Sequence, residues 1–195
     1  MTRLIICFAI ACLAVTAANA ENFDADRLVR IDRVGAPVVS PAGDMIVYTL
    51  RRTDMEADKG RYDLWLSPID GGEPRQLTTH EANDTSPAWS PDGRYILFLS
   101  SRGDSTQVWR LPVEGGAAEP VTNLPLDVST FRVSPTGDRL LVSMSVYLDC
   151  EDLKCTVDRN AAREDDKVTA QRYDQLFMRH WDYWLDDQRS QLFSV

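Results

Sequence analysis

The sequence predicts an all-β protein, an incomplete β-propeller of about three blades with four antiparallel strands in each blade. Three observations carry this prediction. A Ser-Pro-x-Gly turn occurs three times, several other landmarks repeat after 44 residues, and each turn is followed by an apolar strand. Four-stranded units that recur every ~40–45 residues are typical of a β-propeller.

Each residue type in the Ser-Pro-x-Gly turns has a conformational reason to be there. Proline presets φ at the second turn position, and glycine supplies the positive φ that closes a hairpin. The following segments, 45–50, 95–99 and 140–144, are apolar on both faces, so each is expected to lie between two neighbouring sheets. The predicted turn residues are Ser40, Pro41 and Gly43, then Ser90, Pro91, Asp92 and Gly93, and finally Ser134, Pro135 and Gly137.

Two tryptophans mark matching positions of the repeat. Trp65 and Trp109 are 44 residues apart, as are two Gly-Gly pairs, so we expect both rings to anchor blade packing. The predicted boundaries are about 36–80 for blade 1, about 85–123 for blade 2 and about 129–195 for blade 3.

The third blade is interrupted by an insert at 147–180, whose polar part at 158–172 is predicted to be helical. Gln191-Leu192-Phe193 then repeats Gln107-Val108-Trp109, and the sequence stops at Val195, before the expected Gly-Gly turn. Residues 21–195 are therefore expected to form a partial propeller that ends inside a blade. Open sheet faces would leave it marginally stable.

The first 20 residues have the pattern of a secretory signal peptide, with Arg3, an apolar run at 4–15 and cleavage between Ala20 and Glu21. As a helix the apolar run reaches only ~18 Å, less than a ~30 Å hydrocarbon core, so no stable membrane anchor is expected. A lipoprotein signal at Cys12 is the weaker alternative. The predicted location is secreted or periplasmic.

Cys150 and Cys155 are the cysteines that remain after signal removal. In an oxidising compartment a local disulfide is favoured, with a metal site or two free thiols as alternatives. The formal net charge of −9 disfavours nucleic-acid binding, which needs a basic face. Neither a cofactor nor a metal site is predicted, because the acidic residues lack the spacing of a calcium loop.

Three segments carry a resemblance to a known family. S-P-D-G-R-Y-I-L-F-L-S-S-R at 90–102 and V-W-R-L-P-V-E-G-G at 108–116 resemble the propeller of prolyl oligopeptidase-type (S9) serine peptidases, especially bacterial dipeptidyl aminopeptidases and acylaminoacyl peptidases. Y-D-Q-L-F-M-R-H-W-D-Y-W at 173–184 resembles a stretch of a secreted subgroup in which the Cys pair also occurs. The S-P-D-G unit is shared with TolB-like and WD40-like propellers.

The resemblance implies an N-terminal propeller that caps an α/β-hydrolase domain and admits only peptides. The sequence has no G-x-S-x-G and no glycine after Gly137, so it cannot form a nucleophile elbow. We therefore expect the hydrolase domain to be absent and the chain to be inactive alone, with that domain and peptide substrates as its partners. The alternative is a TolB-like scaffold that binds proteins.

The segment Arg179, His180, Trp181 and Asp182 is expected to have an interdomain or pore-lining role. His180 and Asp182 could instead belong to a catalytic triad, but no nucleophile context accompanies them.

Overall fold

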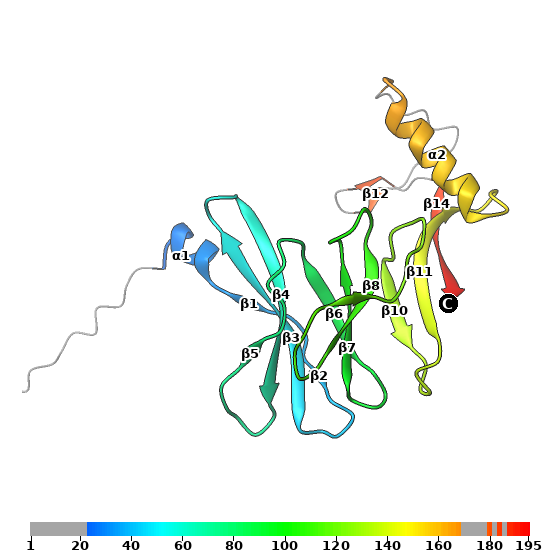
Figure 1. Ribbon diagram of the computed structural model, residues 1–195. Helices are drawn as coiled ribbons and strands as arrows, with labels where there is room; N and C mark the ends of the chain where they lie inside the picture. The colour runs from blue at the N-terminus through cyan, green and yellow to red at the C-terminus, as the bar shows by residue number, and fades with distance from the viewer. Residues whose placement is uncertain (1–22, 169–178, 181–182, 185–186) are drawn as a thin grey trace, which may run out of the picture.

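The computed structural model describes residues 23–168, 179–180, 183–184 and 187–195. Three antiparallel sheets stand side by side in chain order, as three blades of a propeller (Figure 1). This confirms the predicted all-β, incomplete propeller. The predicted signal peptide, with its cleavage site at Ala20 and Glu21, lies outside the described residues.

Blade 1 follows a short helix, α1 (Ala25–Arg30), which Asp24 caps by accepting a hydrogen bond from Arg27 N. Its inner strand is divided into two pieces, which both pair with the next strand, and the sheet begins three residues before the predicted start at 36. Its strands are β1 (Arg33–Val34), β2 (Val38–Val39), β3 (Met45–Asp54), β4 (Lys59–Pro68) and β5 (Arg75–Gln76).

Blade 2 is a regular four-stranded sheet with the order β6-β7-β8-β9. Its inner strand contains an irregularity between Thr85 and Ala88, where Ser86 has a φ of 53°. The strands are β6 (Asp84–Trp89), β7 (Tyr95–Ser100), β8 (Gln107–Pro112) and β9 (Glu119–Pro120).

Blade 3 has three described strands where four were predicted: β10 (Thr130–Val133), β11 (Leu140–Tyr147) and β14 (Gln188–Ser194). The helix of the insert, α2 (Leu153–Asp165), begins five residues before the predicted start at 158. The reason is local, because the Asp152 carboxylate accepts a hydrogen bond from Cys155 N at 2.8 Å and so caps the helix earlier. The pair β12 (Arg179–His180) and β13 (Tyr183–Trp184) forms a separate two-stranded sheet.

The three Ser-Pro-x-Gly turns have one geometry. Gly43, Gly93 and Gly137 adopt φ values of 78°, 70° and 77°, and each glycine N–H donates to the serine carbonyl of its turn at 2.9 Å. The serine hydroxyl accepts a hydrogen bond from the backbone N–H five residues later, at 2.9–3.2 Å. In the second turn, the Asp92 carboxylate also accepts hydrogen bonds from the Ser90 hydroxyl and from Arg94. These hydrogen bonds lower the pKa of Asp92 to about 2.

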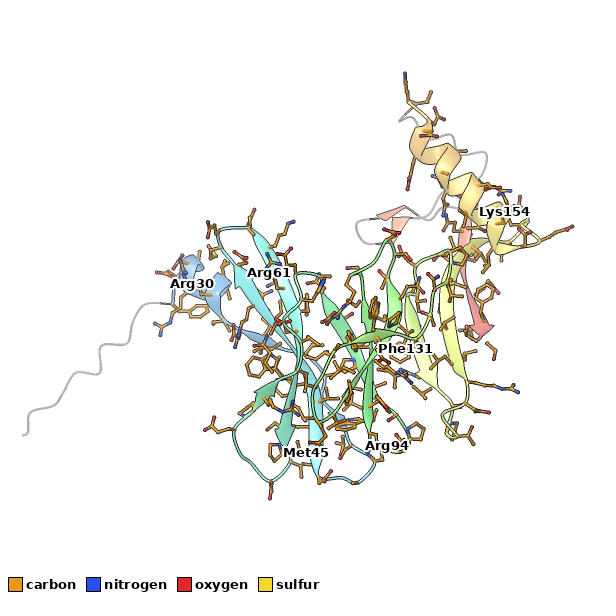
Figure 2. All side chains as sticks on the ribbon, viewed as in Figure 1. Arg30, Met45, Arg61, Arg94, Phe131 and Lys154 are labelled. Carbon is orange, nitrogen blue, oxygen red and sulfur yellow. A yellow bond between two sulfur atoms is a disulfide. The ribbon has the colours of Figure 1, made fainter. Side chains whose placement is uncertain are left out.

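Two apolar cores lie between the blades (Figure 2). One joins blade 1 to blade 2 and the other joins blade 2 to blade 3, where Phe131 is 3% exposed. In β7 the side chains alternate between them: Ile96 and Phe98 face blade 1, whereas Leu97 and Leu99 face blade 3. This alternation explains why the strand is apolar at every position.

The two predicted packing tryptophans occupy equivalent positions but different surroundings. Trp109 packs against the core between blades 1 and 2. Trp65 belongs to neither described core, because it lies on the face of blade 1 that points away from blade 2. Sequence analysis missed Trp89, which is 9% exposed in the same core and donates its indole N–H to Val38 O at 2.9 Å.

Substitutions at equivalent positions of blades 1 and 2 should therefore lower the free energy of unfolding by different amounts. Phe98 is fully buried between blades, so Phe98→Ala should lower the free energy of unfolding by about 3–5 kcal/mol. Tyr48, at the same distance from its Ser-Pro turn, is only partly buried, and Tyr48→Ala should cost less than about half as much. Urea unfolding monitored by fluorescence measures both, and equal losses would mean that the outer face of blade 1 is also covered.

Candidate functional site

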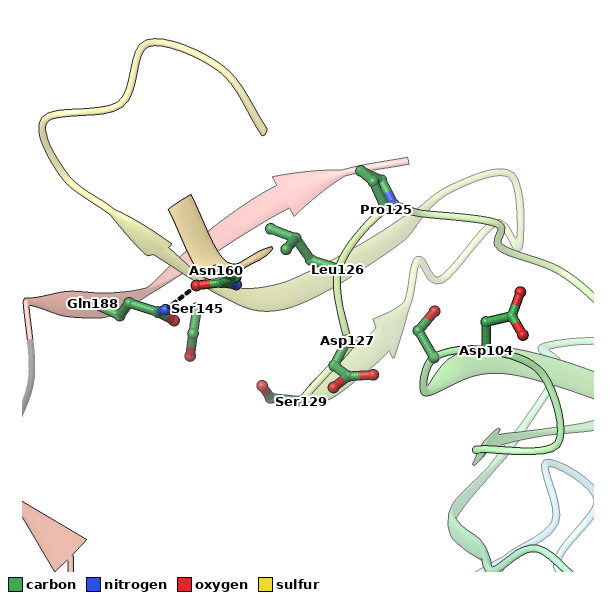
Figure 3. Close-up of a pocket in the computed structure, with 9 residues that line it drawn as sticks. Asp104, Pro125, Leu126, Asp127, Ser129, Ser145, Asn160 and Gln188 are labelled. Carbon is green, nitrogen blue, oxygen red and sulfur yellow. Dashed lines mark hydrogen bonds between the residues drawn. The ribbon is translucent and has the colours of Figure 1, made fainter. Parts of the chain in front are cut away.

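A pocket of about 390 Å³ lies where blades 2 and 3 meet helix α2 (Figure 3). The β7–β8 loop, the segment before β10, strands β11 and β14, and α2 all contribute to its wall. Most of its lining side chains are polar: Asp104, Ser105, Pro125, Leu126, Asp127, Ser129, Ser145, Asn160 and Gln188.

Hydrogen bonds fix the two sides of this pocket. The Asp127 carboxylate accepts from Thr106 N at 2.6 Å, which holds the segment before β10 against the β7–β8 loop. On the opposite side, Gln188 Nε2 donates to Asn160 Oδ1 at 2.8 Å and connects β14 to α2. With the carboxylates of Asp104 and Asp127, the wall suits a polar ligand that donates hydrogen bonds. Among the residues whose side chains the structure describes, no serine of the pocket is hydrogen-bonded to a histidine.

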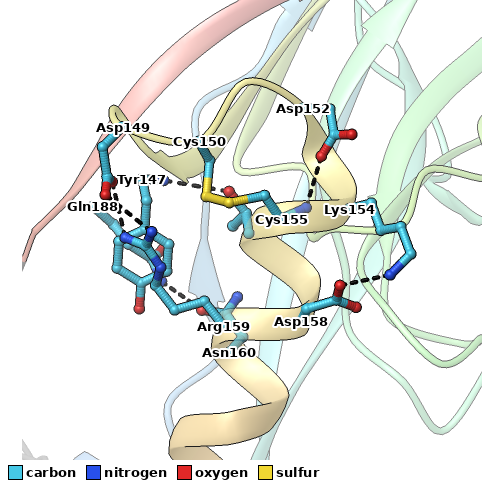
Figure 4. Close-up of a disulfide and its surroundings, with 11 residues drawn as sticks. Tyr147, Asp149, Cys150, Asp152, Lys154, Cys155, Asp158, Arg159, Asn160 and Gln188 are labelled. Carbon is cyan, nitrogen blue, oxygen red and sulfur yellow. Dashed lines mark hydrogen bonds and ion pairs between the residues drawn. A yellow bond between two sulfur atoms is a disulfide. The ribbon is translucent and has the colours of Figure 1, made fainter.

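A disulfide between Cys150 and Cys155 joins helix α2 to the segment that follows β11, with a Cα–Cα distance of 5.5 Å (Figure 4). A second connection lies beside it, because Tyr147 N donates to the fully buried hydroxyl of Thr156 at 3.4 Å.

Arg159 adds a third connection between helix and strand. Its guanidinium donates two hydrogen bonds to Asp149, at 2.8 and 2.9 Å, and lies 4.4 Å from the centre of the Tyr147 ring (Figure 4). The hydrogen bonds from Arg159 also lower the pKa of Asp149. These contacts position the next residue, Asn160, at the pocket.

A second cluster lies at the junction of blades 1 and 2. Arg102 Nη2 forms an ion pair of 2.6 Å with Asp84, whose side chain is fully buried, and the guanidinium lies 5.1 Å from the centre of the Trp109 ring. Burying an unpaired carboxylate lowers the stability of the fold. The ion pair with Arg102 therefore offsets the desolvation of Asp84.

The same arrangement occurs in blade 1, where Arg52 pairs with Asp32 at 3.2 Å and lies 4.9 Å from the Trp65 ring. Both arginines stand 12 residues after the serine of their turn. This spacing is the signal by which sequence analysis could have found the clusters. Val146 occupies the corresponding position in blade 3, which therefore lacks the ion pair.

Asp63 lies beside the Arg102 cluster. Burial, and then the charge of Asp84, raise its pKa, although the Thr78 hydroxyl donates to its carboxylate at 3.4 Å. Gln107 occupies the equivalent position in blade 2 and accepts the corresponding hydrogen bond from Thr122 at 2.8 Å without carrying a charge.

The segment with the predicted interdomain role is described only in part. The backbone of Arg179 and His180 forms β12, while Trp181 and Asp182 lie outside the described residues. Their role stays a prediction.

In the part of the chain that the structure describes, no helix is long and apolar enough to cross a membrane.

The three stacked antiparallel sheets define a propeller-type repeat protein, and comparison with known families specifies which one. The sequence profile of the TolB beta propeller domain matches residues 27–167. The chain therefore belongs to the TolB beta propeller family.

Several of the similar proteins are named as peptidases, and others are named as Tol-Pal system protein TolB. The uncharacterized peptidase YuxL of Bacillus subtilis is 34% identical over 123 residues, which cover 63% of this chain and 19% of that protein. Dipeptidyl-peptidase 5 of Porphyromonas gingivalis is 28% identical over 166 residues, 85% of this chain and 23% of that protein. The chain thus spans about a fifth of the length of these relatives.

A solved structure shows the same fold. The acylaminoacyl peptidase of Pyrococcus horikoshii superposes with a TM-score of 0.51 at 19% identity, over 64% of this chain and 19% of that one. The resemblance to the propeller part of peptidases, which motifs at 90–102 and 108–116 suggested, is confirmed.

The raised pKa of Asp63 predicts a stabilising substitution. Asp63→Asn keeps the acceptor for Thr78 and removes a charge that the folded state disfavours, so it should raise the melting temperature at pH 7. The gain should shrink as the pH falls through the raised pKa of Asp63, and it should vanish below the ordinary aspartate value of 3.8. Thermal melts between pH 3 and 8 measure it. In blade 2, Gln107→Glu should destabilise the chain at pH 7 for two reasons: it buries a charge, and it removes the hydrogen bonds that Gln107 Nε2 donates to Leu124 O and Leu126 O. A gain in stability there would contradict the argument.

The disulfide predicts a modest effect on stability. It links residues only five apart, and closing so short a loop stabilises a fold by about 2 kcal/mol. The double substitution of Cys150 and Cys155 by serine should cost that amount while leaving α2 formed, because Thr156 and Arg159 still hold it. Urea unfolding and far-ultraviolet circular dichroism measure both quantities. Complete loss of the helical signal would show that the disulfide alone holds the helix.

Proposed function

We propose that this chain is the N-terminal propeller part of a secreted S9-type serine peptidase, and that it restricts access of peptides to an α/β-hydrolase domain. Hydrolysis would take place in that domain, because the G-x-S-x-G pattern is absent from these 195 residues. The propeller would act as a filter, admitting extended peptides and excluding folded proteins.

One observation carries the proposal. The similarity to dipeptidyl-peptidase 5 of Porphyromonas gingivalis extends over 85% of this chain but only 23% of that protein. A propeller segment that makes up such a fraction of a peptidase leaves room for further blades and a catalytic domain. The polar pocket between blades 2 and 3 supports the proposal as a surface that could contact a peptide on its way to the catalytic domain.

The proposed location outside the cytoplasm is supported by the sequence and by the disulfide. Residues 1–20 have the three parts of a signal peptide, and Cys150 and Cys155 form a disulfide, which is stable in oxidising compartments.

A second candidate is a binding scaffold without peptidase activity. It is favoured by the match to the TolB beta propeller domain, since that profile describes a propeller and no catalytic domain. Under this alternative, the pocket and the open sheet faces would contact a protein partner directly.

Activity assays separate the two candidates. The purified chain should release no fluorophore from dipeptide substrates, and turnover abolished by a serine-directed reagent would contradict the proposal. The intact gene product should cleave the same dipeptides while leaving a folded protein substrate uncut. If the intact product has no serine nucleophile and no activity on any dipeptide, the scaffold candidate stands instead.

A further inference from the structure

The pocket between blades 2 and 3 carries negative charge that its own wall does not neutralise. The carboxylates of Asp104 and Asp127 line it, and none of its described lining residues is cationic (Figure 3). Asp127 uses its Oδ1 atom to accept from Thr106 N at 2.6 Å. Among the described residues, the Asp104 carboxylate forms neither a hydrogen bond nor an ion pair. A positively charged ligand would therefore be favoured in this pocket.

The junction of blades 1 and 2 shows what occupies the equivalent place there. The period of 44 residues aligns Arg61 with Ser105 and Glu81 with Pro125. Arg61 Nη1 donates to Glu81 O at 3.0 Å, and Arg61 Nε donates to the Asp54 carboxylate at 3.1 Å. At this junction a guanidinium of the chain itself thus lies between a carboxylate and a backbone carbonyl.

Backbone contacts show that the two junctions correspond in space as well as in sequence. Tyr62 N donates to Asn83 Oδ1 at 3.1 Å, and Thr106 N donates to Asp127 Oδ1 at 2.6 Å. Donors and acceptors of these two hydrogen bonds are both 44 residues apart. Asp127 therefore places a second carboxylate where the first junction has a neutral amide.

The second junction keeps the carboxylate of the first and lacks its arginine. Asp54 and Asp104 each stand 14 residues after the serine of their turn, but the position of Arg61 is taken by Ser105. The Ser105 hydroxyl already accepts from Gln107 Nε2 at 2.8 Å. A short side chain replaces a long cationic one, and a pocket of about 390 Å³ lies beside it.

We propose that this pocket binds the guanidinium of an arginine side chain from a peptide, in the place that Arg61 takes at the first junction. The guanidinium would donate to the Asp104 carboxylate and to the carbonyl of Pro125. Its planar array of five N–H donors suits two acceptors at once. That the ligand is a peptide rests on the proposed function, whereas its positive charge follows from the pocket.

A pair of blocked peptides tests the proposal. Acetyl-Ala-Arg-Ala-amide should bind the purified full chain. The same peptide with citrulline, which keeps the shape of arginine but is neutral, should bind at least about tenfold more weakly, the loss expected for a hydrogen bond to a charged group. Isothermal titration calorimetry measures both affinities. Added salt should weaken binding of the arginine peptide, because Asp104 is exposed.

Variants of the chain locate the binding site. Asp104→Asn should weaken binding of the arginine peptide about tenfold, because it removes the carboxylate partner. Ser105→Arg should abolish binding, because the chain would then supply its own guanidinium as blade 1 does. Glu114→Gln is the matched control, since it removes an exposed carboxylate beyond the opposite end of β8, and it should bind as the wild type does.

Three results would each overturn the proposal: equal affinity for the arginine and citrulline peptides, binding that survives both pocket variants, or no binding of the arginine peptide at millimolar concentration. These measurements require no hydrolysis. Peptidase activity of the intact gene product without arginine binding here would overturn this inference alone. Binding here with no such activity in the intact product would overturn only the peptidase proposal.

Discussion

The structure depends on one constraint, which is that its central strands are apolar on both faces. Such a strand is stable only between two other layers. In β7, Ile96 and Phe98 pack toward blade 1 while Leu97 and Leu99 pack toward blade 3. Blade 2 therefore holds the described structure together, since both cores include its side chains, and the Ser-Pro-x-Gly turns keep each blade in the register that this alternation requires.

The same stacking decides where charge can lie. Asp84 is fully buried at the junction of blades 1 and 2, and the Arg102 guanidinium compensates it while stacking on Trp109. Burial, and then the nearby charge of Asp84, raise the pKa of Asp63 beside this pair. Removing Arg102 would leave a buried carboxylate without its ion-pair partner, which is strongly destabilising.

The candidate site lies where the chain departs from the repeat. The insert of blade 3 supplies α2, and three contacts at the end of β11 hold that helix so that Asn160 reaches the pocket between blades 2 and 3. A repeating scaffold with local insertions can thus offer specific surfaces without changing its core.

The sequence by itself determined the repeat, the turns and the strands, because these follow from local residue preferences and from a period that can be counted. It also contained the spacing of Arg52 and Arg102, 12 residues after each turn, though nothing local revealed its purpose. Only the tertiary structure decided which equivalent residues are buried. Trp65 and Trp109 match in sequence, yet only Trp109 packs in a described core. Burial depends on what lies on the far side of a sheet, and that is settled by residues distant in the chain.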